Sequence, residues 1–159
     1  MSSPHHLDEP GAPLLFASGA PGLVVTDVDS TLITQEVIEE LAEAAGTREQ
    51  VAAVTARAMN GELDFAESLR ERVATLRGVP HSVFADVLAR ITPTKGAREL
   101  IDAVHAADGH FGVVSGGFEE VVAPLVASLG IDFYAANRLE VVDGYLTGRV
   151  LGRIVTSQV

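Results

Sequence analysis

Two aspartates, spaced two residues apart, directly follow a short apolar run near the start of the chain. Leu23–Val25 is typical of a buried strand, and Asp27 and Asp29 come just after it. Side chains on extended backbone repeat every second residue, so both carboxyls point to one side if that geometry persists. In open α/β sheets, ligands bind at the carboxyl ends of the strands. Two close carboxyls there can act as nucleophile and proton donor.

Ser30 and Thr31 follow this pair, and small hydroxyl residues suit a turn that offers backbone N–H groups to an anion. The plain alternative is an exposed acidic turn, because Asp-x-Asp is common by itself. The apolar run before the pair and the Ser-Thr-Leu sequence after it favour a catalytic site.

A second candidate segment ends an apolar run at a hydroxyl and two glycines. We expect a strand over His110–Ser115 and a helix over Phe118–Leu129, separated by Gly116 and Gly117. Glycines let backbone N–H groups approach a phosphate, and a helix N-terminus favours its negative charge. An ordinary strand-to-helix turn would have the same sequence.

Arg72 falls on the apolar side of a predicted helix over residues 64–76. At about 100° per residue, it lies inside the apolar stripe of that helix. The stripe consists of Phe65, Leu69, Val73 and Leu76. A cation in this position either extends its head group into water over a packed stem or meets an anion. The planar guanidinium suits bidentate binding of a carboxylate.

The remaining pattern predicts an α/β core interrupted by helices. Four helices in succession are expected over residues 37–45, 47–59, 64–76 and 81–90. Gly46 ends the first, and Thr47 with Gln50 has the spacing of a capping box for the second. Because no strand separates them, we interpret residues 38–92 as a helical cap inserted between two parts of the core, 22–37 and 93–159.

The second part of the core contains further elements, and the chain start contains none. They are a helix over 94–107, a short strand over 133–136, and a hairpin of 139–142 and 145–150 with an Asp143-Gly144 turn. Residues 1–21 are rich in Pro, Gly, Ala and Ser, and are interpreted as a flexible lead-in without a secretory signal.

Composition narrows the possible functions. The 159 residues carry 22 acidic and 11 basic side chains, a net charge of −11, which argues against a nucleic-acid partner. No apolar run reaches membrane-spanning length. The chain has no cysteine, so disulfides and thiolate metal sites are excluded, in keeping with a cytoplasmic protein.

Two motifs resemble those of the haloacid dehalogenase-like phosphatases. Asp27-Val-Asp-Ser-Thr-Leu32 resembles motif I in the form found in the phosphoserine phosphatase branch, and Ser115-Gly-Gly117 resembles motif II. The resemblance implies a Rossmann-like parallel sheet with a helical cap inserted after the first strand. It implies that Asp27 is phosphorylated, that Asp29 protonates the leaving alcohol, and that both bind Mg²⁺. Ser115 and Gly116 would bind the phosphoryl group.

The same resemblance assigns substrate-binding residues in the cap. Arg72 would bind the substrate carboxylate, Glu36 the substrate ammonium, and Met59 and Phe65 would line an apolar pocket. From the residues alone, Glu36 shares a polar face with three other glutamates and would be solvated. Met59 and Phe65 would ordinarily be assigned to the core.

The implied activity is Mg²⁺-dependent hydrolysis of O-phospho-L-serine, the last step of serine biosynthesis, with a small phosphomonoester as substrate and with neither a nucleic acid nor a membrane as partner. Three alternatives remain. The substrate is another small phosphomonoester, or the chain is a non-catalytic module that binds an amino acid or phosphoester through Arg72 and Glu36. A receiver-type signalling domain also phosphorylates an aspartate at a strand end, but neither a second aspartate nor a helical insert suits it.

Two motifs of the family are not found in this sequence. The family has a lysine after the hairpin and, beyond it, a Gly-Asp-Gly-x-Asn-Asp loop that binds Mg²⁺. Lys95 is the only lysine, and no Gly-Asp-x-x-x-Asp pattern follows Ser115. We therefore expect the sequence to be the first portion of a longer phosphatase, inactive by itself, with Leu23–Asp27 as an unpaired edge.

Overall fold

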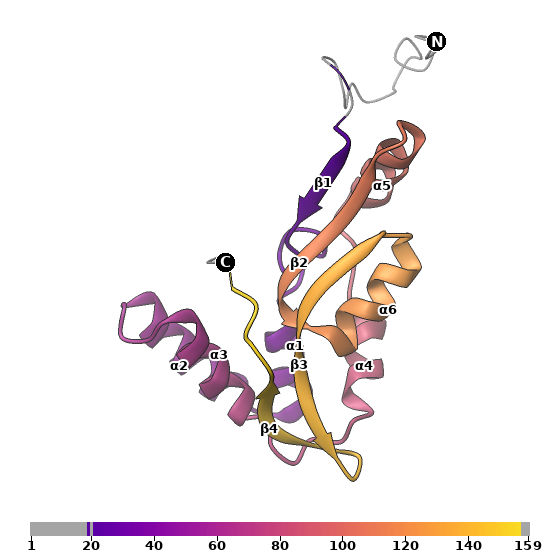
Figure 1. Cartoon of the computed structure of the whole chain (residues 1–159). Helices are drawn as coiled ribbons and strands as arrows, with labels where there is room; N and C mark the ends of the chain where they lie inside the picture. Colours follow the sequence, from indigo (N-terminus) through magenta and orange to yellow (C-terminus); the bar gives the residue numbers. More distant parts are fainter. Residues whose placement is uncertain (1–18, 20, 157–159) are drawn as a thin grey trace.

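The sheet has four strands, in the order in which they occur along the chain (Figure 1). The computed structural model describes residues 19 and 21–156, so most of the predicted lead-in lies outside the described residues. The strands are β1 (Leu23–Thr26), β2 (His110–Phe118), β3 (Phe133–Val142) and β4 (Tyr145–Leu151). The first three are parallel, and β4 returns antiparallel to β3. This sheet and the helices around it confirm the predicted α/β class.

The first four of the five helices between β1 and β2 follow one another without an intervening strand, as predicted. They are α1 (Val37–Ala45), α2 (Arg48–Met59), α3 (Phe65–Ala74) and α4 (Val83–Arg90), and the core adds α5 (Ala97–Ala106) and α6 (Glu119–Leu129). In Figure 1, α2 and α3 stand together to one side of the parallel strands. The other two helices of the insert contact each other, and α4 also contacts α6. The predicted domain boundaries stay a prediction.

Helix caps follow local chemistry, although one prediction is wrong. Gly46 ends α1 in the left-handed conformation with φ 72°, as expected. The capping box lies at Asp64 instead of Thr47: the Asp64 carboxylate accepts the Glu67 N–H at 2.8 Å, and the Glu67 carboxylate accepts the Asp64 N–H at 2.9 Å. Thr47 makes no such bond, and its hydroxyl oxygen instead accepts from the Thr75 hydroxyl.

The chain between α3 and α4 forms turns that bond to the β3–β4 hairpin, and both helices are shorter than predicted. The Gly78 N–H donates to the Leu146 carbonyl, and the His81 N–H donates to the Gly144 carbonyl, each at 2.8 Å. Pro80 forms an isolated bridge with Tyr145. These contacts with the β3–β4 hairpin end α3 at Ala74 and delay the start of α4 to Val83.

Strand β2 continues through both glycines to Phe118, whereas we had expected it to end at Ser115. Val114 pairs with Ala135 of β3, and Phe118 pairs with Asn137. Ser115–Gly117 therefore face a single residue of β3, and we refer to these residues as the β2 bulge. Strand β3 is one long strand that includes both predicted segments.

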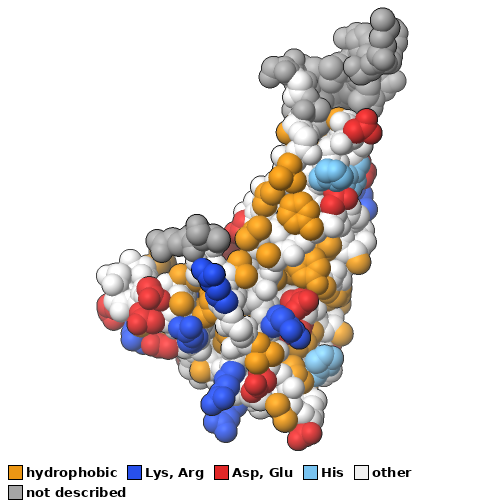
Figure 2. Space-filling view, viewed as in Figure 1, with side chains coloured by type: hydrophobic (Ala, Val, Ile, Leu, Met, Phe, Trp, Pro, Cys, Tyr) orange, Lys and Arg blue, Asp and Glu red, His pale blue; other side chains and the backbone are white. Residues whose placement is uncertain are grey.

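One face of the parallel strands is covered and the other is open. Phe111 and Val113 of β2 are buried on the side of α5, together with Ile101 and Val104. The opposite face leaves large apolar side chains exposed, seen in orange in Figure 2. They are Leu23, Val25, Val114 and Phe133. Within the described part of the chain, β1 pairs only with β2, so it is the edge strand that we expected.

The length and apolarity of a helix decide whether it could cross a membrane. No helix among residues 21–156 is long and apolar enough to cross a membrane.

Candidate active site

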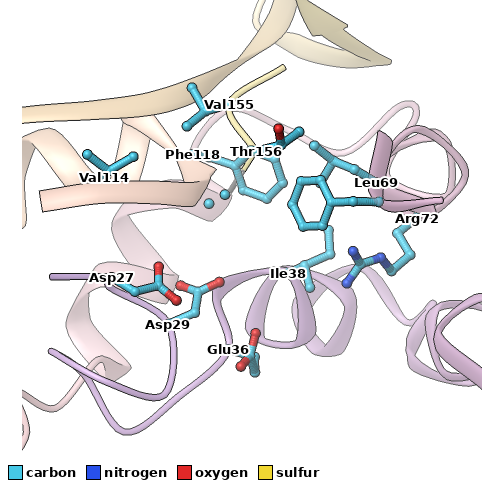
Figure 3. A pocket seen from close by; sticks show the side chains of 13 residues that line it. Asp27, Asp29, Glu36, Ile38, Leu69, Arg72, Val114, Phe118, Val155 and Thr156 are labelled. Atoms are coloured by element: carbon cyan, nitrogen blue, oxygen red, sulfur yellow. The ribbon is translucent and has the colours of Figure 1, made fainter. Parts of the chain in front are cut away.

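A cavity of about 360 Å³ lies where β1 and β2 reach their carboxyl ends. One side of it is acidic, formed by Asp27, Asp29 and Glu36, and we call this side the acidic wall. The other side comes from α3 and consists of Phe65, Leu69 and Arg72, which we call the cap wall. Figure 3 shows the carboxyls of Asp27 and Asp29 side by side, as the strand spacing predicted.

The turn after β1 fixes the two aspartates through its own backbone. The Asp27 carboxylate accepts the Val28 N–H at 2.7 Å, and the Val28 carbonyl accepts the Thr31 N–H. Ser30 has a positive φ of 53°, and its N–H donates to the Gln35 carbonyl at 3.0 Å. The N–H groups of Ser30 and Thr31 are therefore used inside the turn. Our expectation that they face an anion is wrong.

Asp29 occupies an environment that favours its protonated form. Burial raises its pKa, and the neighbouring carboxylates of Glu36 and Asp27 raise it further, to about 7. Its Oδ1 is buried, and no described residue bonds to it. A carboxyl that holds its proton near neutral pH can donate that proton to a leaving group, whereas an ordinary aspartate cannot.

The β2 bulge forms the rear of the cavity, where its glycines lie close to side chains of both walls. A Cβ on Gly116 would lie 2.7 Å from the Phe65 ring, and a Cβ on Gly117 would lie 3.4 Å from Asp29 Oδ1. Ser115 is fully buried behind the lining, and its Oγ accepts the Gly117 N–H at 2.9 Å. The helix expected after the glycines is α6, which begins at Glu119 with Phe118 as its N-cap, one residue later than predicted.

Arg72 reaches from α3 into the cavity, with its guanidinium directed toward the acidic wall in Figure 3. Its Nε donates to the Ser68 carbonyl at 3.3 Å. Burial lowers the pKa of Arg72, while the nearby carboxylates of Glu36 and Asp29 oppose this shift. Among residues 21–156 it forms no ion pair, so the cavity contains a guanidinium that can bind an anion.

Three further residues were predicted to bind substrate, and two of them line the cavity while the third does not. Glu36 lines the cavity and accepts the Ser30 hydroxyl at 2.7 Å, so it does not lie on a solvated face with the other glutamates of α1. Phe65 also lines the cavity. Met59 is the last residue of α2, is 84% exposed and lies outside the lining, which contradicts its predicted place in the pocket.

Several lining residues were not predicted. They are Ile38, Leu69, Val114, Phe118, Val155 and Thr156. Leu69 was visible in the sequence only as part of an apolar stripe, and no local pattern marks Val155 or Thr156. These two follow β4, and their position depends on how the chain returns to the sheet.

The residues present fit part of a Mg²⁺ site. The Asp27 carboxylate supplies one hard oxygen of the kind that Mg²⁺ binds, and the unpartnered Oδ1 of Asp29 supplies a second when Asp29 is ionised. Within the described ranges, no group of three or more His, Cys, Asp or Glu residues could hold a metal ion. The two aspartates would thus leave most positions of an octahedral shell to other ligands.

Comparisons with known proteins show the family of the chain. A family model described as haloacid dehalogenase-like hydrolase matches residues 24–157. The chain is 55% identical over 142 residues to the phosphoserine phosphatase of Streptococcus thermophilus, covering 89% of this chain and 66% of that protein. It is 52% identical over 136 residues to the phosphoserine phosphatase of Lactococcus lactis, covering 86% and 63%. The chain thus spans about two thirds of the length of these relatives.

Solved structures show the same fold. One is a phosphoserine phosphatase described as a phospho-aspartyl intermediate analogue, with a TM-score of 0.77 and 44% identity, covering 84% of this chain and 64% of that one. Another is a substrate-bound phosphoserine phosphatase complex, with a TM-score of 0.77 and 44% identity, covering 82% and 62%. With the family match over most of its length, the chain belongs to the haloacid dehalogenase-like hydrolases.

Proposed function

We propose that this protein acts in the hydrolysis of O-phospho-L-serine to L-serine and phosphate. The observation that carries the proposal is the pair of opposed walls, with two carboxyls on one side of a single cavity and, on the other, a guanidinium that forms no ion pair with any described residue. Phosphoserine has a phosphate at one end and a carboxylate at the other, so it can engage both walls at once. The identity to phosphoserine phosphatases supports this substrate.

The first step is the transfer of the phosphoryl group to Asp27. Its carboxylate attacks phosphorus, an Asp–O–P bond forms, and the bond from phosphorus to the serine oxygen breaks. The departing oxygen takes the proton of Asp29, whose pKa of about 7 keeps that proton available. L-Serine is released, and an aspartyl phosphate remains on Asp27.

The second step returns the enzyme to its starting state. Water attacks the phosphorus of the aspartyl phosphate and loses a proton to the Asp29 carboxylate. Inorganic phosphate leaves, Asp27 is again ionised, and Asp29 is again protonated. Ser115 and Gly116 of the β2 bulge would bind the phosphoryl oxygens during both steps.

Asp27 and Asp29 would also hold Mg²⁺, which supplies positive charge beside the phosphate when bound. Such charge is needed because the site lies in a protein of net charge −11 and has an acidic wall of its own. Lys95, the only lysine of the chain, is exposed and lies outside the cavity lining.

Selection of the substrate falls to residues from the insert and its border. Arg72 would bind the carboxylate in a bidentate manner, and Glu36 would bind the ammonium. Phe65 and Leu69 would exclude water around the short carbon chain. We also propose residues 38–92 as the cap domain and a cytoplasmic location for the protein.

The test is phosphate release from O-phospho-L-serine with Mg²⁺, by the full product of the gene. O-phosphoethanolamine, which lacks the carboxylate, and p-nitrophenyl phosphate, which lacks the amino-acid group, serve as comparison substrates. We expect phosphoserine to be hydrolysed with the highest kcat/KM. Equal kcat/KM values for all three substrates would reject phosphoserine as the specific substrate and favour a general phosphomonoesterase.

A further inference from the structure

Asn137 is a buried amide with no role in the reaction described so far. It is 1% exposed and pairs with Phe118 immediately after the β2 bulge. A bulge removes regular ladder partners from the backbone, so its polar groups need other partners. The Asn137 Nδ2 donates to the Gly116 carbonyl at 3.0 Å and so replaces a ladder bond inside the bulge.

The other end of the same amide binds a different part of the chain. Its Oδ1 accepts the Val155 N–H at 2.7 Å, and Val155 and Thr156 line the cavity. One side chain therefore holds both the bulge and the segment that follows β4. An aspartate has no donor for Gly116 at neutral pH, and a leucine has neither donor nor acceptor.

The β2 bulge lies against both walls of the cavity, so its position affects the shape of the site. Gly116 lies against the Phe65 ring, and Gly117 lies beside Ser115 and Asp29. Because Gly117 lies this close to Asp29, a shift of the bulge would change the space beside the proton donor. In close-packed interiors such shifts are passed to neighbouring groups.

We propose that Asn137 is a positioning residue for the phosphate side of this cavity, a role that rests on the proposed phosphoserine hydrolysis. Its amide sets the position of the β2 bulge and of Val155 together. The β2 bulge and Val155 are therefore already in position when the phosphoryl group binds. The competing explanation is that Asn137 only stabilises the fold, as buried hydrogen-bonded asparagines commonly do.

Two variants and a matched control separate these explanations. Asn137→Asp keeps the acceptor for Val155 and loses the donor to Gly116. Asn137→Leu has a similar volume and loses both bonds. Asn60→Asp makes the same chemical change at the exposed end of α2 and is the control.

Three measurements are made on each protein: thermal unfolding, amide exchange by NMR, and phosphoserine affinity by NMR titration in EDTA, so that the substrate is not turned over. We expect both Asn137 variants to weaken phosphoserine binding by about tenfold, which is typical of a buried group that loses its partner. The Val155 amide should stay protected in Asn137→Asp and lose protection in Asn137→Leu. The Gly117 amide signal should move in both, and Asn60→Asp should leave all three measurements unchanged.

A lower unfolding temperature with unchanged phosphoserine affinity in both variants would overturn the proposal in favour of a structural role. If the wild-type protein binds no phosphoserine, the proposed function fails, and the amide data then decide on Asn137. A Gly117 signal that is unchanged in Asn137→Asp would show that Asn137 does not position the bulge. If Asn137→Leu does not fold, Asn137→Asp alone decides.

Discussion

The two walls of the cavity are built in different ways. The acidic wall follows β1, and its turn is held by backbone hydrogen bonds around the fully buried Val28. The cap wall belongs to one helix, α3, from which a single long side chain, Arg72, reaches across. The acidic wall therefore suits a reaction that needs fixed geometry, whereas the cap wall suits the selection of a substrate. Each wall can be altered while the other stays intact.

The largest effect is expected at the acidic wall. Asp27→Asn keeps the size of the side chain but removes the nucleophile, so turnover of every phosphomonoester should fall by about 10⁴-fold or more. Phosphate release by the full gene product is the measurement, with circular dichroism to verify folding. Near-normal rates in Asp27→Asn would rule out the proposed mechanism.

The next effect concerns residues 1–159 taken alone. Both walls are present, but the chain has neither a lysine in the cavity nor an additional acidic loop. Oriented charges at a phosphoryl group are each worth roughly 3 kcal/mol, so we expect turnover about 10⁴-fold below that of a phosphatase with both. The exposed edge and face of β1 should also favour self-association.

The measurement compares phosphate release and oligomer size for residues 1–159 and for the full gene product. If residues 1–159 are monomeric and as active as the full gene product, the two walls suffice and this prediction is wrong.

A third prediction uses the protonation of Asp29. Its pKa is about 7 when folded, against an ordinary value of 3.8, so the folded protein binds a proton between these values that the unfolded chain releases. The free energy of unfolding should therefore decrease as pH rises from about 4 to 7, by up to about 4 kcal/mol. Asp29→Asn should lack this contribution.

Thermal unfolding from pH 4 to 8 in EDTA measures this difference. Asp29→Asn should gain stability relative to the wild type as the pH rises, with most of the gain reached near pH 7. Parallel curves for the two proteins would show that the environment of Asp29 does not raise its pKa.

A smaller effect is expected at the cap wall. Arg72→Ala removes the partner of the substrate carboxylate and should lower kcat/KM for phosphoserine by about 2–3 kcal/mol, or roughly 10²-fold. The loss for phosphoethanolamine should be much smaller. Arg70→Ala, an exposed arginine on the same helix, is the matched control. Equal losses on both substrates would assign Arg72 a structural role.

The two aspartates of the acidic wall could be predicted from the sequence because their signals are local, whereas Glu36, judged from the residues alone, was expected on a solvated face. An apolar strand followed by Asp27 and Asp29 needs no tertiary information, and the two residues lie where the spacing places them. Arg72 was found for a related reason, because helical periodicity places it on the apolar side of α3.

The β2 bulge could not be predicted, because Ser115-Gly-Gly117 has the local sequence of a strand end. Pairing with β3 keeps the backbone extended, and this pairing involves Asn137, more than 20 residues away in sequence. The capping box was predicted at Thr47 and formed at Asp64, since the Thr47 side chain contacts Thr75 of another helix. In both places a contact distant in sequence overrides the local preference.

The central claim is that the Asp27 carboxylate attacks phosphorus, and the position of the phosphoryl group tests it most directly. The full gene product is mixed with phosphoserine and Mg²⁺, quenched in acid, digested and analysed by peptide mass spectrometry. We predict a phosphoryl group on Asp27. It should be absent from the Asp27→Asn variant, and in the Arg72→Ala variant it should still be found on Asp27. Continued turnover with the phosphoryl group on Ser115, or with none on the protein, would contradict the account.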